Sequence, residues 1–401
     1  MPLLIVHVGA RPIGCPSFAI PKIRYRKIYL MITNIYVQNF KAFAEAEIPP
    51  CQLNILSGLN GVGKSTFLQS LLLLRQSYRQ NTLLDKGLLL NGEYIEIGKG
   101  KDAYAMYGTG EKLITFEVEW DEEIELRGEF QSRDELDLLP THQLQISDQK
   151  VWQQALFQDK WQYLNTERVS PQTFFPTSAY HIEQIHTLGN HGEFTTHFIA
   201  KNQRQDISIK ALAHPRANSL ALLAQLDAWL GEITPNVRLT SVLFEEFEIA
   251  RLSYKFEVGE EFTEDMKPNN VGFGLTYVLP VVTAVLCANP GDLLIIENPE
   301  SHLHPQGQAR LGKLFAQAAE QDVQLFIETH SDHVLNGVRV ATKQQLISPE
   351  KVGIFFFERY LETDEHCTDI IQPIIDENGR INKRPKGFFD EWGNQLDELI
   401  K

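Results

Sequence analysis

The sequence predicts an α/β protein with a parallel sheet at its centre, and three features lead to this prediction. Segments typical of strands and of helices alternate over residues 277–357, which is the pattern of parallel strands joined by helical crossovers. The expected strands there are short apolar runs, as in strands buried on both faces. A glycine-rich turn after residue 57 joins another apolar strand to a long helix.

The apolar pattern predicts each element in order along the chain from residue 31. Strands are expected at Ile32–Phe40, Leu53–Leu56, Leu113–Trp120, Glu123–Phe130, Val237–Phe244, Ile249–Val258, Leu293–Ile296, Val323–Ile327 and Val352–Phe357. Helices are expected at Ser65–Arg79, Asn218–Leu230, Tyr277–Cys287, Gln306–Ala319 and Asp332–Thr342. The alternating segments on either side of Asp121 and Glu122 predict an antiparallel hairpin.

Composition limits the classes of protein that the chain can belong to. With 43% hydrophobic residues in 401, the chain can build a core, which excludes a mainly disordered protein. The formal charge of −15 argues against a protein that coats nucleic acid non-specifically, although a local basic patch stays possible. Four cysteines without C-x-x-C spacing and no apolar run of about 20 residues predict a cytoplasmic protein without a membrane segment.

Residues 1–30 differ from the rest of the chain. They contain no Asp or Glu, and they hold prolines and a basic cluster at residues 22–27. We interpret Met31 as the true start and residues 1–30 as an upstream extension or loose tail. The alternative is a basic arm that contacts a partner.

The segment from Gly58 to Ser65 matches G-x-x-x-x-G-K-[ST] in full. Its residues are Gly58, Leu59, Asn60, Gly61, Val62, Gly63, Lys64 and Ser65, with Thr66 as a second hydroxyl. A strand precedes the loop and a helix follows it, so backbone N–H groups and the helix N-terminus can bind phosphates. We expect Lys64 to reach the β- and γ-phosphates of ATP, and Ser65 to hold Mg²⁺. A chance glycine turn is the alternative.

A second element of the site is the apolar run that ends in Glu297. A buried strand that delivers a carboxylate at its C-terminal end is what an Mg²⁺-nucleotide site needs beside a P-loop. We expect Glu297 to act through the water shell of Mg²⁺, together with Ser65. Many core strands also end in Glu, and this is the alternative for Glu297 taken alone.

Two further segments complete the candidate site. His330 ends another apolar strand, and parallel strands place such ends at one edge, where His330 can reach the γ-phosphate or the attacking water. A structural histidine is the alternative. Gly272 and Gly274 precede an apolar helix and make an anion-receptive N-terminus, although a plain turn has the same pattern.

In this order the motifs resemble the ABC-type ATPase heads of the RecF, SMC and OLD group. More narrowly, the chain resembles stand-alone bacterial AAA-family ATPases that end in a small domain of unknown function. The segments that carry this resemblance are Glu297–Pro305, Glu328–Asn336, Lys386–Asp390, Glu167–Pro171 and Gly189–Glu193. The resemblance implies an α/β P-loop NTPase fold with an ABC/RecF-like head, a mixed sheet and an inserted α+β middle region.

The resemblance also implies a site shared by two protomers. Gly272–Thr276 of one copy would close over the γ-phosphate held by the P-loop of the other, so that ATP clamps a head-to-head homodimer. His330 matches the switch histidine of such heads, and Ser301–His304 matches a turn at the dimer interface. Lys41 matches a basic side chain near the nucleotide. For Lys41, as for Arg168, a solvated or ion-paired side chain is an equal alternative.

One position departs from the pattern of the group, which commonly has a second acid where this chain has Asn298. An amide cannot take a proton from water. We therefore expect Glu300 or His330 to substitute, or hydrolysis to be slow. Gln76 is a weak candidate for the glutamine that related heads place near Mg²⁺.

The histidines allow another interpretation, a transition-metal site. His302, His304, His330 and His333 lie near carboxylates, and a second series recurs at residues 181, 186, 191 and 197. The first series lies inside the ATPase motifs, and spacing by five residues does not align side chains on one helical face.

The predicted organisation has an extension at 1–30 and the two halves of an ATPase head at 31–130 and 261–345. A middle region at 131–260 is inserted between the halves, and a small C-terminal domain occupies 346–401. The predicted function is that of an ATP-binding P-loop ATPase of ABC/RecF-like type, with the nucleotide gating head dimerisation. The dimer is expected to drive a separate effector, such as a nuclease or toxin, in DNA maintenance or anti-phage defence. Alternatives are a hydrolysis-poor scaffold and a direct DNA-binding repair ATPase.

Overall fold

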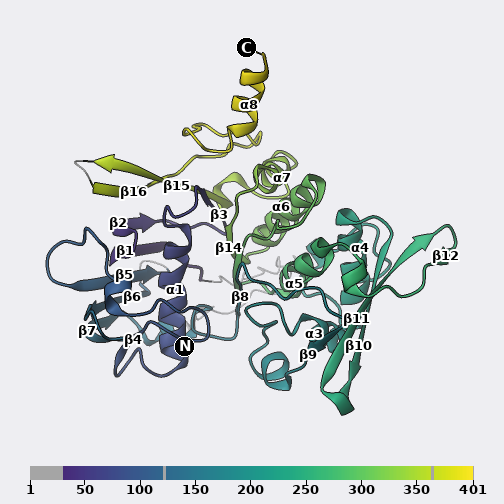
Figure 1. Cartoon of the computed structure of the whole chain (residues 1–401), viewed down its shortest axis with the longest axis horizontal. Helices are drawn as coiled ribbons and strands as arrows, with labels where there is room; N and C mark the ends of the chain where they lie inside the picture. The colour runs from purple at the N-terminus through teal and green to yellow at the C-terminus, as the bar shows by residue number, and fades with distance from the viewer. Residues whose placement is uncertain (1–29, 121–122, 363–364, 401) are drawn as a thin grey trace, which may run out of the picture.

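The computed structural model describes residues 30–120, 123–362 and 365–400, which form three sheets (Figure 1). The expected N-terminal extension lies outside the described residues, apart from Leu30. The helices are α1 (Lys64–Arg79), α2 (Gly100–Ala103), α3 (Thr195–Asn202), α4 (Leu222–Ile233), α5 (Phe273–Cys287), α6 (Pro305–Glu320), α7 (Asp332–Lys343) and α8 (Glu391–Ile400).

The central sheet has the strand order β16-β15-β3-β14-β13-β8. Its strands are β3 (Leu53–Gly58), β8 (Trp161–Leu164), β13 (Leu293–Glu297), β14 (Gln324–Glu328), β15 (Val352–Glu362) and β16 (Glu365–Ile371). All neighbours in this sheet are parallel except β15 and β16, which form an antiparallel pair. The predicted parallel sheet is confirmed, with one antiparallel strand at its edge.

The central sheet separates two hydrophobic cores, and strand β13 shows how. Leu293 and Ile295 belong to the core that contains α1, whereas Leu294 and Ile296 belong to the core that contains α5, α6 and α7. Because successive strand residues point to opposite faces, a strand covered on both sides must be apolar throughout. Fully burying one such side chain contributes about 1.5–3 kcal/mol.

A second, antiparallel sheet covers the other side of α1 and has the order β2-β1-β5-β6-β7-β4. Its strands are β1 (Asn34–Phe40), β2 (Phe43–Ile48), β4 (Gly87–Leu89), β5 (Leu113–Glu119), β6 (Glu125–Gln131) and β7 (Leu138–Ile146). The expected hairpin is confirmed, because β5 pairs antiparallel with β6.

The third sheet lies at the right of Figure 1 and comprises β9 (Phe174–Pro176), β10 (Val237–Phe244), β11 (Ile249–Val258) and β12 (Glu261–Phe262). The region expected as an insertion, 131–260, supplies strands to all three sheets: β7 to the antiparallel sheet, β8 to the central sheet, and β9 to β11 here. The proposed division of the chain into domains stays a prediction.

Two helices begin four residues away from the predicted start. Helix α4 begins at Leu222 and not at Asn218, because Ala221 pairs with Asp206 in a β-bridge and the Gln225 side chain donates to the Ser219 carbonyl. Helix α5 begins at Phe273, one turn before the expected Tyr277, so the glycine segment itself forms its first turn.

The C-terminal segment is anchored to the central sheet before it ends in α8, which projects from the body in Figure 1. Phe388 is buried and its ring meets that of Phe356 on β15 edge-on, at 5.4 Å between centroids. The Arg339 guanidinium on α7 donates to the Gly379 carbonyl at 2.8 Å. Among the described residues, no helix combines the length and the apolar character needed to cross a membrane.

Candidate active site

The candidate residues gather at one edge of the central sheet. Strands β3, β14, β13 and β8 are parallel neighbours, so their C-terminal ends lie side by side. The P-loop follows β3, and three short segments follow the other strands: Thr329–His330, Asn298–Glu300 and Thr166–Arg168. Loops at this edge are where α/β sheets bind ligands.

The P-loop has the backbone geometry that its glycines were expected to provide. Gly63 has φ 110°, and a Cβ there would lie 2.8 Å from the Phe43 ring. A larger residue would therefore be strained at this position and would also collide with its neighbour. The Lys64 side chain is buried against the loop, with its Nζ donating to the carbonyls of Gly58 at 3.0 Å and Leu59 at 2.8 Å.

These residues fit the polyphosphate of ATP. Helix α1 starts at Lys64, its cap residue Gly63 offers no side-chain acceptor, and its first turn contains no acid. The first backbone N–H groups of a helix lack partners within the helix and bind anions. Leu59, Asn60 and Gly61 are exposed, and a Cβ at Gly61 would find open space. The loop thus has room on its outer side, and the cation of Lys64 lies beneath it.

The hydroxyl of Ser65 donates to the carboxylate of Glu328, a residue that was not among those predicted for the site. Its distances to Oε2 and Oε1 of Glu328 are 3.0 and 3.2 Å, and Lys64 Nζ is 3.8 Å from Oε1. Burial raises the pKa of Glu328 to about 7, with the charge of Glu297 adding to the shift and Lys64 opposing it. The sequence feature that could have identified Glu328 is that β14, like β13, is an apolar strand that ends in Glu.

Glu297 has different partners. Tyr163 donates its hydroxyl proton to Oε1, and Thr166 donates its hydroxyl proton to Oε2, both at 2.9 Å. Both donors come from β8 and the loop after it, on the side of β13 away from β14. The expectation that Glu297 and Ser65 together hold Mg²⁺ stays a prediction.

Arg168 holds the loop after β13 in place. Its guanidinium donates to the carbonyls of Glu297, at 2.5 Å, and Asn298, at 3.1 Å, and stacks 4.9 Å from the centroid of the Tyr277 ring. Burial lowers the pKa of Arg168 to about 10. The fork geometry of arginine suits two carbonyls at once. Arg168 therefore belongs to the candidate site, because it binds the backbone of the loop after β13.

Asn298 adopts a left-handed backbone conformation, with φ 44°. Its N–H donates to the Glu328 carbonyl at 2.8 Å, and its side-chain amide donates to the Thr166 hydroxyl at 3.3 Å. The side-chain Oδ1 is buried and has no hydrogen-bond partner among the described residues. Asn298 thus links the ends of β13 and β14, and it offers no group that can take a proton.

Glu300 and His330 are in contact. Glu300 is buried, and its Oε1 accepts a hydrogen bond from the backbone N–H of His330 at 2.9 Å. Burial raises the pKa of Glu300. His330 as a whole residue is exposed, but its imidazole is partly buried. This partial burial, and secondly the charge of Lys64, lower the pKa of His330. Both roles, support of hydrolysis and the phosphate switch, stay predictions.

The glycine segment before α5 lies against the turn after β13. A Cβ at Gly274 would lie 2.6 Å from the His302 carbonyl, so this close approach requires glycine. The segment and the turn at His302–His304 line one cavity of about 430 Å³, and none of the lining residues belongs to the P-loop. Phe273, between the two glycines, is 55% exposed.

Lys41 and Gln76, the two remaining residues predicted near the nucleotide, both form hydrogen bonds within the protein. Lys41 donates to the Gln69 side chain on α1 at 2.8 Å, in a turn whose Ala42 and Phe43 contact Gly63. A role for Lys41 at the nucleotide stays a prediction. The prediction that Gln76 lies near Mg²⁺ is wrong, because Gln76 is about 18 Å along α1 from Lys64. Its side-chain amide donates to the Leu89 carbonyl and accepts from the Ile95 N–H.

The structure gives no support to a transition-metal site. Among residues 30–120, 123–362 and 365–400, no group of three or more His, Cys, Asp or Glu is arranged to hold a metal ion. His181 stacks on Phe194, and His197 accepts from the Ser178 N–H.

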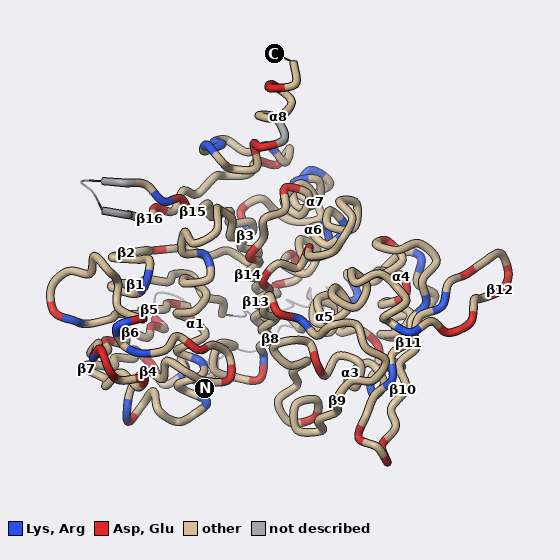
Figure 2. The backbone as a smooth tube through the Cα atoms, in the orientation of Figure 1, with Lys and Arg blue, Asp and Glu red and all other residues tan. Residues whose placement is uncertain are grey.

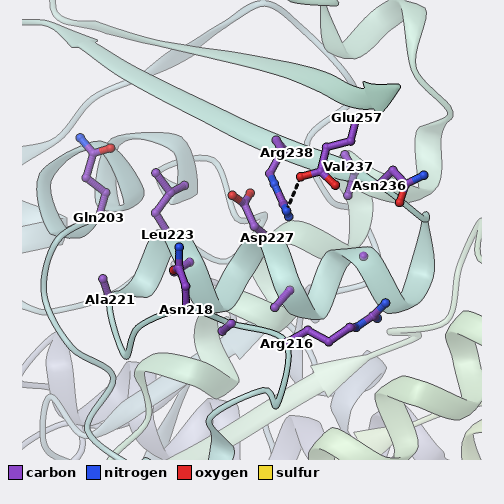
Figure 3. Close-up of a pocket in the computed structure, with 14 residues that line it drawn as sticks. Gln203, Arg216, Asn218, Ala221, Leu223, Asp227, Asn236, Val237, Arg238 and Glu257 are labelled. Atoms are coloured by element: carbon purple, nitrogen blue, oxygen red, sulfur yellow. Dashed lines mark ion pairs between the residues drawn. The ribbon is translucent and has the colours of Figure 1, made fainter. Parts of the chain in front are cut away.

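Two further cavities differ in their distance from the P-loop. One of about 400 Å³ is lined by Gly58, Leu59 and His330 on one side and by Phe389 and Asp390 of the C-terminal segment on the other. Another, of about 480 Å³, lies between α4 and the β10–β11 pair and includes no residue of the candidate site (Figure 3).

Comparisons with known families agree with this geometry. Residues 31–228 match the family described as AAA ATPase domain. Residues 181–336 match that described as AAA domain, putative AbiEii toxin, Type IV TA system. The chain carries AAA-type ATPase domains. Residues 347–399 of this ATPase match a protein family of unknown function (DUF3696).

Solved structures show the same fold. The ATPase is 11% identical to an SMC head bound to the C-winged helix domain of ScpA, over 85% of this chain and 98% of that chain, with a TM-score of 0.51. An SMC head domain from Thermotoga maritima is also similar, with 11% identity, the same coverages and a TM-score of 0.42. None of the curated proteins matches the sequence. The expected α/β fold of an ATPase head is confirmed, and the likeness to the first of these SMC heads is one of fold.

Proposed function

We propose that this ATPase is a nucleotide-gated switch, in which two copies close head to head around ATP and hydrolysis with Mg²⁺ releases them. The observation that carries this is the position of Gly272–Thr276. Gly272, Gly274 and Leu275 line one cavity together with the turn at His302–His304, and no P-loop residue lines that cavity. Phe273 of the same segment is exposed. A glycine-capped helix N-terminus that does not meet its own P-loop is available to a second copy.

The exposed apolar residues support the same assembly. Leu59 at the tip of the P-loop is 70% exposed, and Phe273 beside the glycine segment is 55% exposed. Exposed apolar side chains next to polar binding groups are typical of contact surfaces. In the proposed dimer each P-loop faces the glycine segment of the other copy, and Leu59 and Phe273 become buried.

The switch drives a separate effector, in our proposal a nuclease or toxin that acts in DNA maintenance or anti-phage defence. Direct DNA binding has less support, because the chain has 52 acidic against 37 basic residues. Figure 2 shows Lys and Arg interspersed with Asp and Glu along the described chain.

Two measurements test the switch. Labelled ATP should bind saturably to the protein, and Lys64→Ala should abolish this binding because the buried cation of the P-loop is lost. Light scattering should give the mass of a dimer with ATP and of a monomer with ADP or without nucleotide. A mass that stays the same in all three conditions would contradict the proposal.

A second candidate function, an ATP-dependent clamp with slow hydrolysis, is favoured by Asn298. An amide stands where related heads carry a carboxylate, and its Oδ1 is buried without a partner among the described residues. Phosphate release at about 1 s⁻¹ or faster, unchanged by Asn298→Ala, would exclude this candidate. Dimers that form with ATP and persist without phosphate release would support it.

A further inference from the structure

The hydrogen bond between Ser65 and Glu328 arranges two oxygen donors beside the P-loop. Ser65 Oγ lies 3.0 Å from Oε2 and 3.2 Å from Oε1 of Glu328. A serine hydroxyl has one hydrogen and two lone pairs, so donation to Glu328 leaves the lone pairs available to a cation. Mg²⁺ in nucleotide sites takes hard oxygen ligands, from one or two side chains and the phosphates.

From these contacts we propose that Glu328, in place of Glu297, is the carboxylate that anchors the Mg²⁺ of the bound nucleotide beside Ser65. This inference rests on the proposed function, because it requires a nucleotide in the P-loop.

The strand order gives the first argument for Glu328. Strand β14 is the direct neighbour of β3, with Glu328 in register with Leu56, whereas β13 lies one strand further away, with Glu297 in register with Glu328. Neighbouring strands are about 4.8 Å apart, so the backbone of Glu297 is about 9.6 Å from the strand that carries the P-loop. Of the two acids, Glu328 therefore has its backbone closer to the strand that leads to Ser65.

The partners of Glu297 give the second argument. Each of its carboxylate oxygens already accepts a hydrogen bond, from Tyr163 and from Thr166. Arg168 binds the backbone carbonyl of the same residue. To reach Ser65, Glu297 would have to leave two hydroxyl donors, of which Tyr163 is only 3% exposed.

Charge gives the third argument. The side chains of Glu328 and Lys64 are 7% and 3% exposed, and Lys64 Nζ lies 3.8 Å from Glu328 Oε1. The charges of Glu297 and Glu300 both act on Glu328. Lys64 beside Glu328 and Arg168 near Glu297 and Glu300 supply two positive charges for three carboxylates. One carboxylate is left without a balancing cation, and buried charge without a partner is costly. A divalent cation at Glu328 would supply the missing positive charge.

The test compares Glu328→Gln with Glu297→Gln in the full chain. ATP affinity is measured by calorimetry in excess Mg²⁺ and in EDTA, and bound Mn²⁺ is counted by electron paramagnetic resonance in the presence of ATP. In Glu328→Gln we expect affinity in EDTA to stay at the wild-type value, while Mn²⁺ affinity falls about 10–100-fold. Glu297→Gln should keep its Mn²⁺ affinity within about threefold, since it keeps the Ser65–Glu328 pair.

The opposite pattern, with Mn²⁺ lost in Glu297→Gln and kept in Glu328→Gln, would overturn the inference. Glu328→Asp guards against misfolding: a folded Asp variant, by circular dichroism and melting temperature, should bind Mn²⁺ more tightly than Glu328→Gln. Equal Mn²⁺ affinity in the two Glu328 variants would also overturn it. If the wild-type chain itself binds no ATP, then the proposed function has failed, which is a distinguishable result.

Discussion

The buried carboxylate of Glu300 accepts the backbone N–H of His330 at 2.9 Å and joins the loop after β13 to the end of β14. We predict that Glu300→Ala lowers the free energy of unfolding by about 1–3 kcal/mol, because that part-buried N–H would lose its acceptor. Phosphate release should fall as His330 moves. Glu300→Gln keeps an acceptor oxygen and should lose less than half as much stability in urea unfolding. Equal losses in both variants would show that the hydrogen bond has no such role.

Arg168 should be irreplaceable by lysine. Its guanidinium binds the carbonyls of Glu297 and Asn298 together, and the single ammonium group of lysine cannot reproduce this fork. We predict that Arg168→Lys lowers the free energy of unfolding by about 2–4 kcal/mol, since two part-buried carbonyls lose the donors of one guanidinium. Arg359→Lys on β15 is the matched control and should change stability by less than about 0.5 kcal/mol. Chemical denaturation measures both, and a stable Arg168→Lys would refute the role of the fork.

The glycine segment allows dimerisation to be tested without damage to the fold. Gly272 is the N-cap of α5 with φ −51°, and a Cβ there meets nothing within 4 Å. Asp is a favourable N-cap residue, so Gly272→Asp should fold normally, while its charge repels the γ-phosphate bound by the other copy.

We expect Gly272→Asp to stay monomeric with ATP by light scattering, and Gly272→Ser, which adds no charge, to dimerise. Gly274→Ala should instead lower the melting temperature of the monomer, because its Cβ would lie 2.6 Å from the His302 carbonyl. If Gly272→Asp dimerises at the same ATP concentrations as the wild type, the glycine segment of one copy does not contact the γ-phosphate bound by the other.

Asp227 on α4 should make stability depend on pH. Burial raises its pKa to about 6 from an ordinary value of 3.8, while Arg238 and Lys255 oppose the shift and Glu257 adds to it. Figure 3 shows Asp227 beside the Arg238–Glu257 ion pair. The folded state favours the protonated form of Asp227. The stability that this preference adds to the fold is therefore complete below pH 3.8 and is lost as pH rises through about 6.

We predict that Asp227→Asn is more stable than the wild type by about 1–3 kcal/mol at pH 8, with the difference shrinking towards pH 4. Asn can keep the bond that Oδ1 accepts from the Leu239 N–H at 2.8 Å. Thermal melts across this pH range measure the difference. The exposed Asp397→Asn is the control, and a pH-independent difference between Asp227→Asn and the wild type would contradict the assignment.

The regular elements were largely predictable because they depend on local patterns. Strands β10 and β11 have the expected bounds, and the hairpin β5–β6 has the expected partners. The start of α4 was not predictable, because a β-bridge to Asp206, fifteen residues earlier in the chain, holds Ala221 outside the helix. Gln76 failed as a candidate for a different reason: in the helix that was predicted, it lies about 18 Å along the axis from Lys64.

The candidate site was predicted in part. Motif spacing selected the P-loop, Glu297, Glu300 and His330, and the sheet brings the segments that carry them to one edge. Motif spacing did not assign a role to Glu328, although it ends an apolar strand as Glu297 does. It did not indicate Thr166 at all, and the roles of both residues follow from their contacts with Ser65 and Glu297.

By itself, the order of residues determined the P-loop and the apolar strands, because glycine conformation and hydrophobic periodicity act over a few neighbouring positions. Only the tertiary structure decided which carboxylate meets Ser65. That choice depends on β14 pairing between β3 and β13, and pairing between strands hundreds of residues apart is settled by the burial of both sheet faces.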